Sequence, residues 1–376
     1  MMRGLLLLFF YMAAMSANAR QRPAELGVKI GVLPKGEHNA ITDVKGVKVG
    51  HFTLIQGDDV RTGVTSILPY DGNIFQSKVP AAIYLGNAFG KLAGYTQVKE
   101  LGNIETPILL TNTLAVADAS RALVKYTLEL PGNENVRSVN PVVGETNDSY
   151  LNDIRSFPLQ PEHFVAAIDA ATSGKVEEGN VGAGTGTVCF GYKGGIGTSS
   201  RKLPESLGGY TVGVLVQTNF GGNLTIDGEA IDEILEQYPY RMQILGSVDG
   251  SCMIVVATDA PLDARNLERL AKRAILGLGR TGGIASNGSG DYVIAFSTAE
   301  SLRVPYDPPS PILQQNVLAN DSMTPLFMAV IEATEEAIIN SLWAATTMTG
   351  FEGRTMKELP KEEVLRILRK AGKLKK

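Results

Sequence analysis

One stretch decides the fold class, Gly250-Ser251-Cys252-Met253-Ile254-Val255-Val256-Ala257-Thr258-Asp259-Ala260-Pro261-Leu262, because it joins a glycine turn to a continuous apolar run. Such a run, bounded by turn residues, is typical of a strand with buried faces. After Pro261 and Asp263, apolar residues recur at helical spacing up to Gly279, with Arg and Lys between them. The sequence therefore predicts a buried strand followed by an amphipathic helix.

Further strands and helices are expected along the whole chain. Apolar runs that predict buried strands lie at residues 81–85, 108–110, 210–217 and 292–296. Between residues 41 and 69, β-branched residues alternate with Gly and Asp, which predicts short strands joined tightly. A long helix is expected from Ser322 to about Ala345, and a short charged one after Pro360. This mixture predicts a layered α/β or α+β fold.

The composition is that of an ordinary globular protein. The chain has 376 residues, of which 44% are hydrophobic and 20% charged, so disorder and collagen-like repeats are excluded. Lys and Arg number 35 against 39 Asp and Glu, which gives a net charge of −4. Because no broad basic surface is available, nucleic acid is not an expected partner.

The first nineteen residues predict a secretory signal. Arg3 precedes an apolar run at residues 5–15, and Ala17-Asn18-Ala19 fits the A-x-A cleavage pattern. The run is too short to span a membrane, which needs about 20 apolar residues. We expect a signal peptide at 1–19, a single domain at 20–376, and a periplasmic or secreted location.

Two cysteines, Cys189 and Cys252, stand in apolar strand-like runs. In an exported protein they can pair, or they can remain two buried thiols. The sequence leaves both alternatives open.

Most standard catalytic signatures are absent. His38, His51 and His163 lack the i, i+4 spacing of a zinc helix, so a metal site of His and Cys is not expected. No serine stands in G-x-S-x-G, and Ser199 with Lys202 fits S-x-x-K without its supporting motifs.

A glycine-rich stretch covers residues 179–187. It lacks the Gly-Lys-Ser/Thr ending of a phosphate loop, and residues 188–192 after it look like strand and not helix. A tight loop in which backbone approaches backbone, or a small ligand, is the favoured interpretation.

Ser251 stands at a position where the chain could chemically cleave itself, at the peptide bond before this serine. Residues 246–250 predict a turn that delivers Ser251 to the first position of the buried strand. A strained Gly250–Ser251 peptide can be attacked by the serine's own hydroxyl. The new α-amine, with a reference pKa of about 7.7 to 8.0, would then serve as the base that histidine supplies elsewhere. The alternative is an ordinary turn serine.

Two other polar clusters are candidates for chemistry. Ser289 and Asp291 lead into the apolar run at 292–296, where they can share one face so that the carboxylate orients the hydroxyl. Glu145, within residues 144–148, offers a carboxylate to a cationic ligand. Each cluster taken alone is favoured as an ordinary turn or a solvated loop.

Together these segments resemble the family of L-aminopeptidase D-amidase/D-esterase (DmpA-like) and β-peptidyl aminopeptidases. The resembling motifs follow in order over nearly the whole mature chain. They lie at residues 41–51, 61–65, 143–148, 179–201, 215–221, 250–262 and 286–291.

The resemblance implies an αββα four-layer sandwich, similar in layers to N-terminal nucleophile hydrolases but different in connectivity. It also implies a precursor that cuts itself between Gly250 and Ser251 into chains 20–250 and 251–376. By the same resemblance, cleaved units associate into a homo-oligomer, expected to be a tetramer.

The resemblance also assigns roles within the site. Ser251 is the nucleophile, and Ser289 and Asp291 support it by hydrogen bonding. Asn219 donates to the oxyanion of the tetrahedral intermediate. Glu145 holds the free amine of the substrate. Some members of the family carry Glu at the position of Asp291, so the shorter arm changes the hydrogen-bond geometry here.

The implied reaction is acyl transfer through a Ser251 acyl-enzyme, without a metal or organic cofactor. The implied substrates are short peptides, amides and esters with a free amine and a small first residue, including β-amino acids such as β-alanine. Two other functions stay open at this point. An acetyl transferase of the ornithine type has a similar fold but resembles a Thr nucleophile, and a non-enzymatic exported protein would bind a small anion with residues 179–186.

Overall fold

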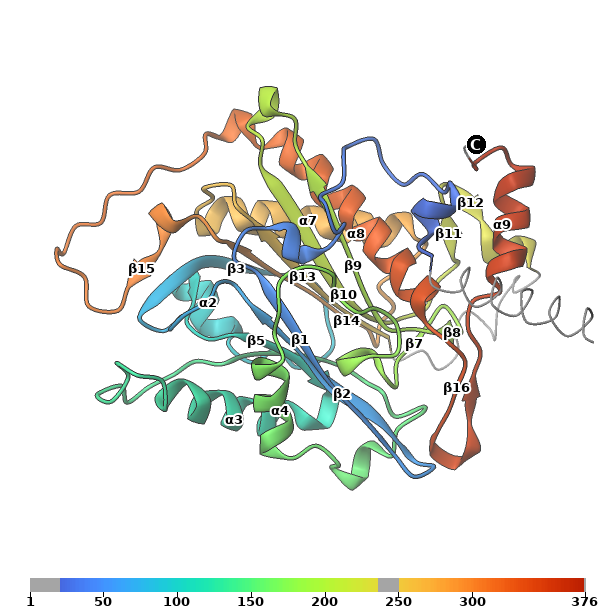
Figure 1. Ribbon diagram of the computed structural model, residues 1–376, viewed down its shortest axis with the longest axis horizontal. Helices are drawn as coiled ribbons and strands as arrows, with labels where there is room; N and C mark the ends of the chain where they lie inside the picture. The colour runs from blue at the N-terminus through green and yellow to red at the C-terminus, as the bar shows by residue number, and fades with distance from the viewer. Residues whose placement is uncertain (1–20, 236–249, 375–376) are drawn as a thin grey trace, which may run out of the picture.

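The computed structural model describes residues 21–235 and 250–374. Within these ranges two β-sheets pack face to face, and helices cover the outer face of each sheet (Figure 1). The predicted signal at 1–19 and most of the predicted turn at 246–250 lie outside the described residues.

The larger sheet has seven strands, and the decisive stretch lies at its centre. Strand β13 pairs in parallel with β14 and antiparallel with β10, and all of its residues are buried. In order, the strands are β15 (Val304–Pro305), β3 (Ser77–Ala88), β14 (Gly290–Ser297), β13 (Ser251–Thr258), β10 (Thr211–Asn219) and β9 (Ile196–Lys202), with β4 (Asn103–Ile104) paired to β3. Four of the five strands predicted from apolar runs are confirmed here.

The smaller sheet has four strands. In order they are β1 (Lys48–Gln56), β2 (Val60–Leu68), β5 (Ile108–Asn112) and β6 (Val142–Thr146). Strands β1 and β2 form a long antiparallel hairpin, whereas β5 and β6 run parallel. The fifth predicted strand, at residues 108–110, is the first part of β5 and is also confirmed.

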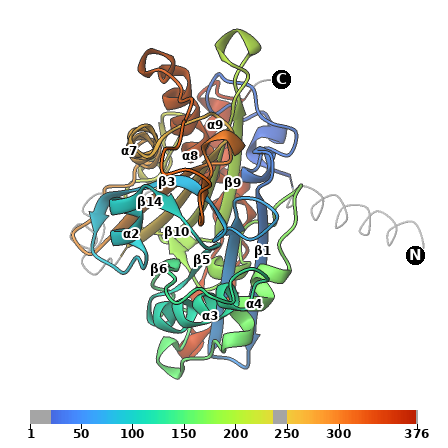
Figure 2. The ribbon, with the colours of Figure 1, turned by 90° about the vertical axis from the view of Figure 1, so that its left-hand side faces the viewer.

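Two pairs of helices complete the layers. Helices α7 (Ala264–Arg280) and α8 (Thr324–Ala344) cover the larger sheet, and α3 (Val116–Leu128) and α4 (Pro161–Asp169) cover the smaller one. The order is helices, sheet, sheet, helices, as Figures 1 and 2 show from two directions. The helices predicted at 264–279 and 322–345 are therefore confirmed within two residues at each end.

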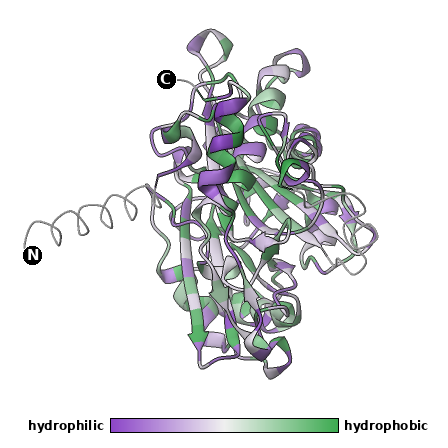
Figure 3. Ribbon diagram, turned by 90° about the vertical axis from the view of Figure 1, so that its right-hand side faces the viewer, coloured by the Kyte–Doolittle hydropathy of each residue, from purple (hydrophilic) through white to green (hydrophobic). Residues whose placement is uncertain are grey.

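Apolar side chains fill all three interfaces between the layers. Along β13 the side chains alternate, so that Met253 packs between the sheets while Ile254 packs beneath α7 and α8. This explains the unbroken apolar run of the strand, since both of its faces are covered. A third cluster, which includes Val64 and Leu123, joins the smaller sheet to α3 and α4. Figure 3 shows hydrophobic residues along much of the strands.

Smaller elements lie at the rim. They are α2 (Tyr95–Leu101), α5 (Ile231–Ile234), α9 (Lys361–Lys370), and the two-stranded hairpins β7 (Val188–Cys189) with β8 (Tyr192–Lys193), β11 (Thr225–Ile226) with β12 (Glu229–Ala230), and β16 (Met348–Thr349) with β17 (Thr355–Met356). Helix α9 confirms the short charged helix predicted after Pro360.

The prediction of short strands at residues 41–69 is wrong in two respects. Ile41–Asp43 is a 3-10 turn, because the Asp43 carboxylate accepts the N–H groups of His38 and Ala40 and holds the backbone in a curl. The strands that follow, β1 and β2, are nine residues long each and pair with one another over their whole length.

Candidate active site

Four of the five predicted site residues meet at one end of the larger sheet. Ser251 is the first residue of β13, and its register partners are Asn219 at the end of β10 and Gly290 at the start of β14. Ser289 and Asp291 flank that glycine. Antiparallel β10 and parallel β14 thus bring together residues that lie more than 30 positions apart in the sequence.

The Ser251 hydroxyl lies against the peptide bond that precedes it. Its Oγ is 2.5 Å from the carbonyl oxygen of Gly250, to which it donates a hydrogen bond. The side chain is buried, with 6% of the residue exposed. Ser251 therefore occupies the predicted strand start, with its nucleophilic atom beside the Gly250 carbonyl.

Asn219 is held in one orientation. Its side-chain Oδ1 accepts a hydrogen bond of 2.9 Å from the backbone N–H of Val188. Because the oxygen is engaged there, the amide N–H groups remain as the donors that Asn219 can offer next to Ser251.

Ser289 and Asp291 form a buried polar pair behind the nucleophile. Ser289 Oγ and both carboxylate oxygens of Asp291 have no hydrogen-bond partner at normal geometry within the described residues. Burial raises the pKa of Asp291 to about 6, and the nearby Ser289 hydroxyl and the Cys252 backbone oppose that shift. Ser289 Oγ also lies 3.2 Å from the position that a Cβ atom on Gly250 would take.

Glu145 reaches the site from the other sheet. Glu145 lies on β6 and is buried. The alternative interpretation of residues 144–148 as a solvated loop is therefore wrong for Glu145. Its Oε1 accepts the backbone N–H of Lys91 at 3.0 Å, and its Oε2 accepts the Thr113 hydroxyl. A carboxylate fixed in this way is a suitable partner for an ammonium group.

Tyr292 and Gly90 belong to the site but were not predicted from the sequence. A Cβ atom on Gly90 would lie 3.0 Å from Glu145 Oε1 and 3.2 Å from the Tyr292 hydroxyl. A Cβ atom on Gly290 would lie 3.0 Å from Tyr292 Cε2 and 3.3 Å from Ser251 Oγ. The Tyr292 ring thus lies between the nucleophile and Glu145, and it packs closely against two glycines that have no side chain to displace it.

The loop formed by the glycine-rich stretch packs directly against neighbouring parts of the protein. The N–H groups of Gly182 and Ala183 donate to the hydroxyls of Thr53 and Thr65, at 2.8 and 3.1 Å. A Cβ atom on Gly186 would lie 2.1 Å from the carbonyl oxygen of Arg61. Close packing of backbone on backbone is confirmed, and the N–H groups of Gly182 and Ala183 are already engaged and cannot bind an anion.

The packing also excludes Ser199 and Lys202, which fit S-x-x-K, as a catalytic pair. The Ser199 hydroxyl donates to Asn39 Oδ1 at 3.0 Å, while Lys202 is exposed. Ser199 and Lys202 therefore lack the arrangement of a nucleophile with its base. His51 is half-buried; loss of hydration lowers its pKa to about 4, and its Nδ1 lies 2.9 Å from Thr65 Oγ1.

Cys189 and Cys252 are free buried thiols. Burial raises the pKa of Cys189 to about 12, so this thiol stays protonated at neutral pH. Over residues 21–235 and 250–374, no group of three or more His, Cys, Asp or Glu side chains is placed to hold a metal ion. In the same ranges, no helix combines the length and the apolarity needed to cross a membrane.

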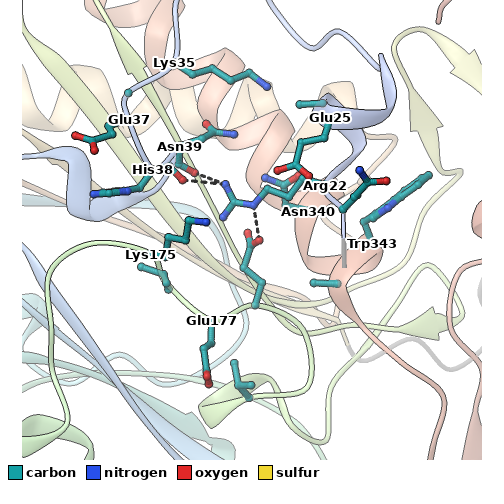
Figure 4. Close-up of a pocket in the computed structure, with 17 residues that line it drawn as sticks. Arg22, Glu25, Lys35, Glu37, His38, Asn39, Lys175, Glu177, Asn340 and Trp343 are labelled. Carbon is teal, nitrogen blue, oxygen red and sulfur yellow. Dashed lines mark hydrogen bonds and ion pairs between the residues drawn. The ribbon is translucent and has the colours of Figure 1, made fainter. Parts of the chain in front are cut away.

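A hollow of about 910 Å³ lies elsewhere in the molecule, beside the first described residues (Figure 4). Arg22 crosses it, with Nε 2.7 Å from Glu178 Oε2 and Nη1 donating to the carbonyls of His38 and Asn39. None of the five predicted site residues lines this hollow. The hollow is large, but polar groups with complementary roles converge at the strand ends. The strand ends are therefore the better candidate for the active site.

Comparison with known proteins shows the family of the chain. Residues 39–356 match the model of peptidase family S58. The chain belongs to peptidase family S58. This match places it among peptidases and not among acetyl transferases.

Relatives in sequence and structure are similar over nearly the whole chain. Beta-peptidyl aminopeptidase BapA of Sphingosinicella microcystinivorans is 42% identical over 377 residues, covering 94% of this chain and 93% of the relative. A Burkholderia sp. beta-aminopeptidase superposes with a TM-score of 0.87 at 38% identity, covering 94% of this chain and 99% of that chain.

A third relative is the L-aminopeptidase D-Ala-esterase/amidase of Ochrobactrum anthropi, with a TM-score of 0.85, 34% identity, and coverage of 94% of this chain and 99% of that one. That enzyme is described as a prototype of the serine aminopeptidases and as a new variant of the Ntn hydrolase fold. The predicted family, the layered fold class and a serine aminopeptidase of the S58 type are thereby confirmed.

Proposed function

We propose that the chain is a precursor that cuts its own Gly250–Ser251 bond, and that Ser251 then acts as the nucleophile of an aminopeptidase. The observation that carries the proposal is the Ser251 hydroxyl, 2.5 Å from the Gly250 carbonyl oxygen at the start of a buried strand. Three groups surround this hydroxyl. Asn219 supplies a hydrogen-bond donor, the Ser289–Asp291 pair supplies polar support, and Glu145 supplies a negative charge.

Self-cleavage begins with an N-to-O acyl shift. Ser251 Oγ forms a bond to the Gly250 carbonyl carbon, the bond from that carbon to the Ser251 nitrogen breaks, and the hydroxyl proton passes to the leaving nitrogen. Water then hydrolyses the ester, which leaves a Gly250 carboxylate, a Ser251 hydroxyl and a free Ser251 α-amine. This amine is the base that the mature enzyme uses.

Aminopeptidase turnover repeats the chemistry on a substrate. The Ser251 amine accepts the proton of its own hydroxyl as Oγ attacks the carbonyl of the substrate's first residue. Asn219 donates to the oxyanion, a contact worth about 3 to 4 kcal/mol of barrier. The leaving amine takes the proton, and water releases the first residue from the acyl-enzyme. The polar support from Ser289 and Asp291 keeps Oγ and the amine aligned.

The substrate class follows from two groups of the site, Glu145 and Ser251. Glu145 binds a free ammonium group, and Ser251 attacks a carbonyl on the same residue, so only the first residue of a chain satisfies both. The relatives named for β-peptidyl aminopeptidase and β-aminopeptidase activity support short peptides, amides and esters that begin with a β-amino acid such as β-alanine.

Export and assembly complete the proposal. The pattern at residues 1–19 supports secretion to the periplasm or beyond, with a mature chain that begins near Arg20. By the family resemblance, the two chains remain in one sandwich after cleavage. By the same resemblance, the cleaved units associate into a homotetramer. No cofactor takes part in the proposed steps.

The decisive experiment is the intact mass of the purified, denatured protein beside Ser251→Ala and Cys252→Ala variants. We expect the wild type and Cys252→Ala to yield a fragment that begins at residue 251, and Ser251→Ala to stay whole. The cysteine variant is the matched control, because it removes the neighbouring side chain of the same strand. An uncut wild type, or cleavage in Ser251→Ala, contradicts the proposal.

A further inference from the structure

Lys193 is a buried lysine that the reaction described above does not use. It lies on β8 with none of its surface exposed, and its Nζ donates to the carbonyls of Gly184, Thr187 and Gly194 at 3.0, 3.0 and 2.9 Å. Burial lowers its pKa to about 7, and the charge of Asp148 opposes that shift. An ammonium group has three N–H donors, so the three carbonyls satisfy it completely.

One of these carbonyls belongs to a peptide group with a second role. The Thr187 carbonyl accepts from Lys193 Nζ and also from the Gly194 N–H, each at 3.0 Å. The N–H on the other side of the same peptide bond is that of Val188, and it donates to Asn219 Oδ1 at 2.9 Å. Because a peptide group is planar, fixing its carbonyl also fixes the direction of its N–H.

The direction of that N–H decides what Asn219 offers to the site. While Val188 donates to Oδ1, the amide nitrogen of Asn219 is free to serve as a donor beside Ser251. If the Thr187–Val188 peptide turned, Oδ1 would lose its partner and the amide could rotate by 180°. It would then present an oxygen where a donor is needed, and an oxygen repels a developing oxyanion.

We infer that Lys193 is a positioning residue for the oxyanion donor, because its ammonium group locks the Thr187–Val188 peptide that orients Asn219. The inference rests on the proposed function, in which Asn219 stabilises the tetrahedral intermediate. Lys193 touches neither the substrate nor Ser251. Its effect passes through one peptide plane and one hydrogen bond, and it acts on the transition state more than on substrate binding.

A double-mutant cycle tests this dependence. The variants are Lys193→Met, Asn219→Ala and the double variant, with Lys202→Met as a matched control at an exposed lysine. The readouts are kcat and KM for a β-alanyl anilide, normalised to the fraction of cleaved chain measured by intact mass. The midpoint of thermal unfolding shows that each variant is folded.

The expected pattern is specific to positioning. Removal of a preorganised oxyanion donor lowers kcat by about 100- to 1,000-fold, and Lys193→Met should lower kcat by about 10- to 100-fold with KM within about twofold. The double variant should be no slower than Asn219→Ala alone, and Lys202→Met should behave as the wild type.

Other outcomes overturn the inference in distinguishable ways. Losses that multiply in the double variant, or a Lys193→Met effect confined to KM, remove the role of Lys193 and leave that of Asn219 intact. An Asn219→Ala variant with normal kcat removes the oxyanion role in the proposed function, and the inference with it. If Lys193→Met does not fold, Lys193→Gln, which keeps two N–H donors, takes its place in the same cycle.

Discussion

The hydroxyl oxygen of Ser251 lies 2.5 Å from the carbonyl oxygen of Gly250, on the two sides of one peptide bond. Gly250 has little room for a side chain, since a Cβ atom there would lie 3.2 Å from Ser289 Oγ and 3.4 Å from the Phe220 backbone. The geometry around the Gly250–Ser251 bond therefore depends on the absence of a side chain at residue 250.

Gly250→Ala should slow self-cleavage without abolishing it. The added methyl group pushes the Ser289 hydroxyl by a few tenths of an ångström, and misplaced supporting groups cost about tenfold or more in rate. Cleavage half-times from intact mass check this. Gly279→Ala is the control, because nothing lies within 4 Å of the added atom. Equal half-times for the wild type and Gly250→Ala would show that the contact with Ser289 does not matter.

Asp291 should give the enzyme an acidic limit. Burial raises its pKa to about 6, so activity that needs the carboxylate falls as the pH drops through about 6. The Ser251 amine, with a reference pKa of about 7.7 to 8.0, causes a separate fall at higher pH. In Asp291→Asn the rate is lower and only the component of the fall near pH 6 is absent, whereas Asp321→Asn, on an exposed turn, keeps the wild-type profile. A pH profile of kcat for cleaved protein measures both. An unchanged acidic limb in Asp291→Asn assigns the titration to another group.

The same carboxyl has the opposite effect on stability. Its pKa is higher in the folded chain than the reference 3.8, so the folded state binds the proton more tightly. The stabilising contribution is present at low pH and is lost as the pH rises through about 6. Asp291→Asn should therefore raise the free energy of unfolding at pH 8, by about 1 to 3 kcal/mol. Denaturant unfolding at pH 8 checks the sign.

Glu145→Gln should separate substrate binding from self-cleavage. The change keeps the shape but removes the charge, so KM for substrates with a free amine should rise about tenfold or more, as expected for loss of a buried ion pair. Self-cleavage should proceed, because the Gly250 carbonyl is attacked without an ammonium group nearby. Glu177→Gln, at the hollow of Figure 4, is the control.

The test of Glu145 uses paired substrates. Steady-state kinetics with β-alanyl anilide give KM, and an N-acetylated analogue gives the rate without an ammonium group. An equal KM for the wild type and Glu145→Gln would move the amine site away from Glu145. A raised KM in Glu177→Gln would instead point to the hollow.

The sequence predicts the order of the helices and strands along the chain better than it predicts which site residues lie close together in space. The apolar run after Ser251 identifies β13 and its start, because both faces of the strand are buried. Nothing local says that Asn219 becomes its register partner or that Glu145 arrives from the other sheet. Those contacts depend on strand order across the whole fold, and only the family resemblance connected them.

Some residues were missed because their local sequence carries no signal. Tyr292 and Lys193 each stand in a strand, where an aromatic residue or a lysine is unremarkable. Asp43 turned an expected strand into a 3-10 turn through its side chain, which alternation of residue types does not reveal. Helix α8 was predicted, but nothing in its local sequence says that its glutamates are buried.

Arg201 and those glutamates give the last prediction. Arg201 is fully buried, with Nε 3.0 Å from Glu332 Oε2 and Nη1 2.8 Å from Glu336 Oε2. Burial favours protonation of Glu336, but Arg201 and Lys35 outweigh it and hold the pKa of that carboxyl below its usual value. Arg201→Met leaves the carboxylates without this partner and should destabilise the fold by about 3 to 5 kcal/mol.

The matched control for Arg201→Met is Arg280→Met. Arg280 pairs with Glu335 of the same helix α8 at 3.2 Å, but it is half exposed, so its loss should cost less than about 1 kcal/mol. Adding Glu332→Gln and Glu336→Gln to Arg201→Met should recover part of the stability, because the buried charges are then gone. Thermal and denaturant unfolding measure all of these variants. Equal losses for Arg201→Met and Arg280→Met would mean that burial of the ion pair adds nothing to the cost of breaking it.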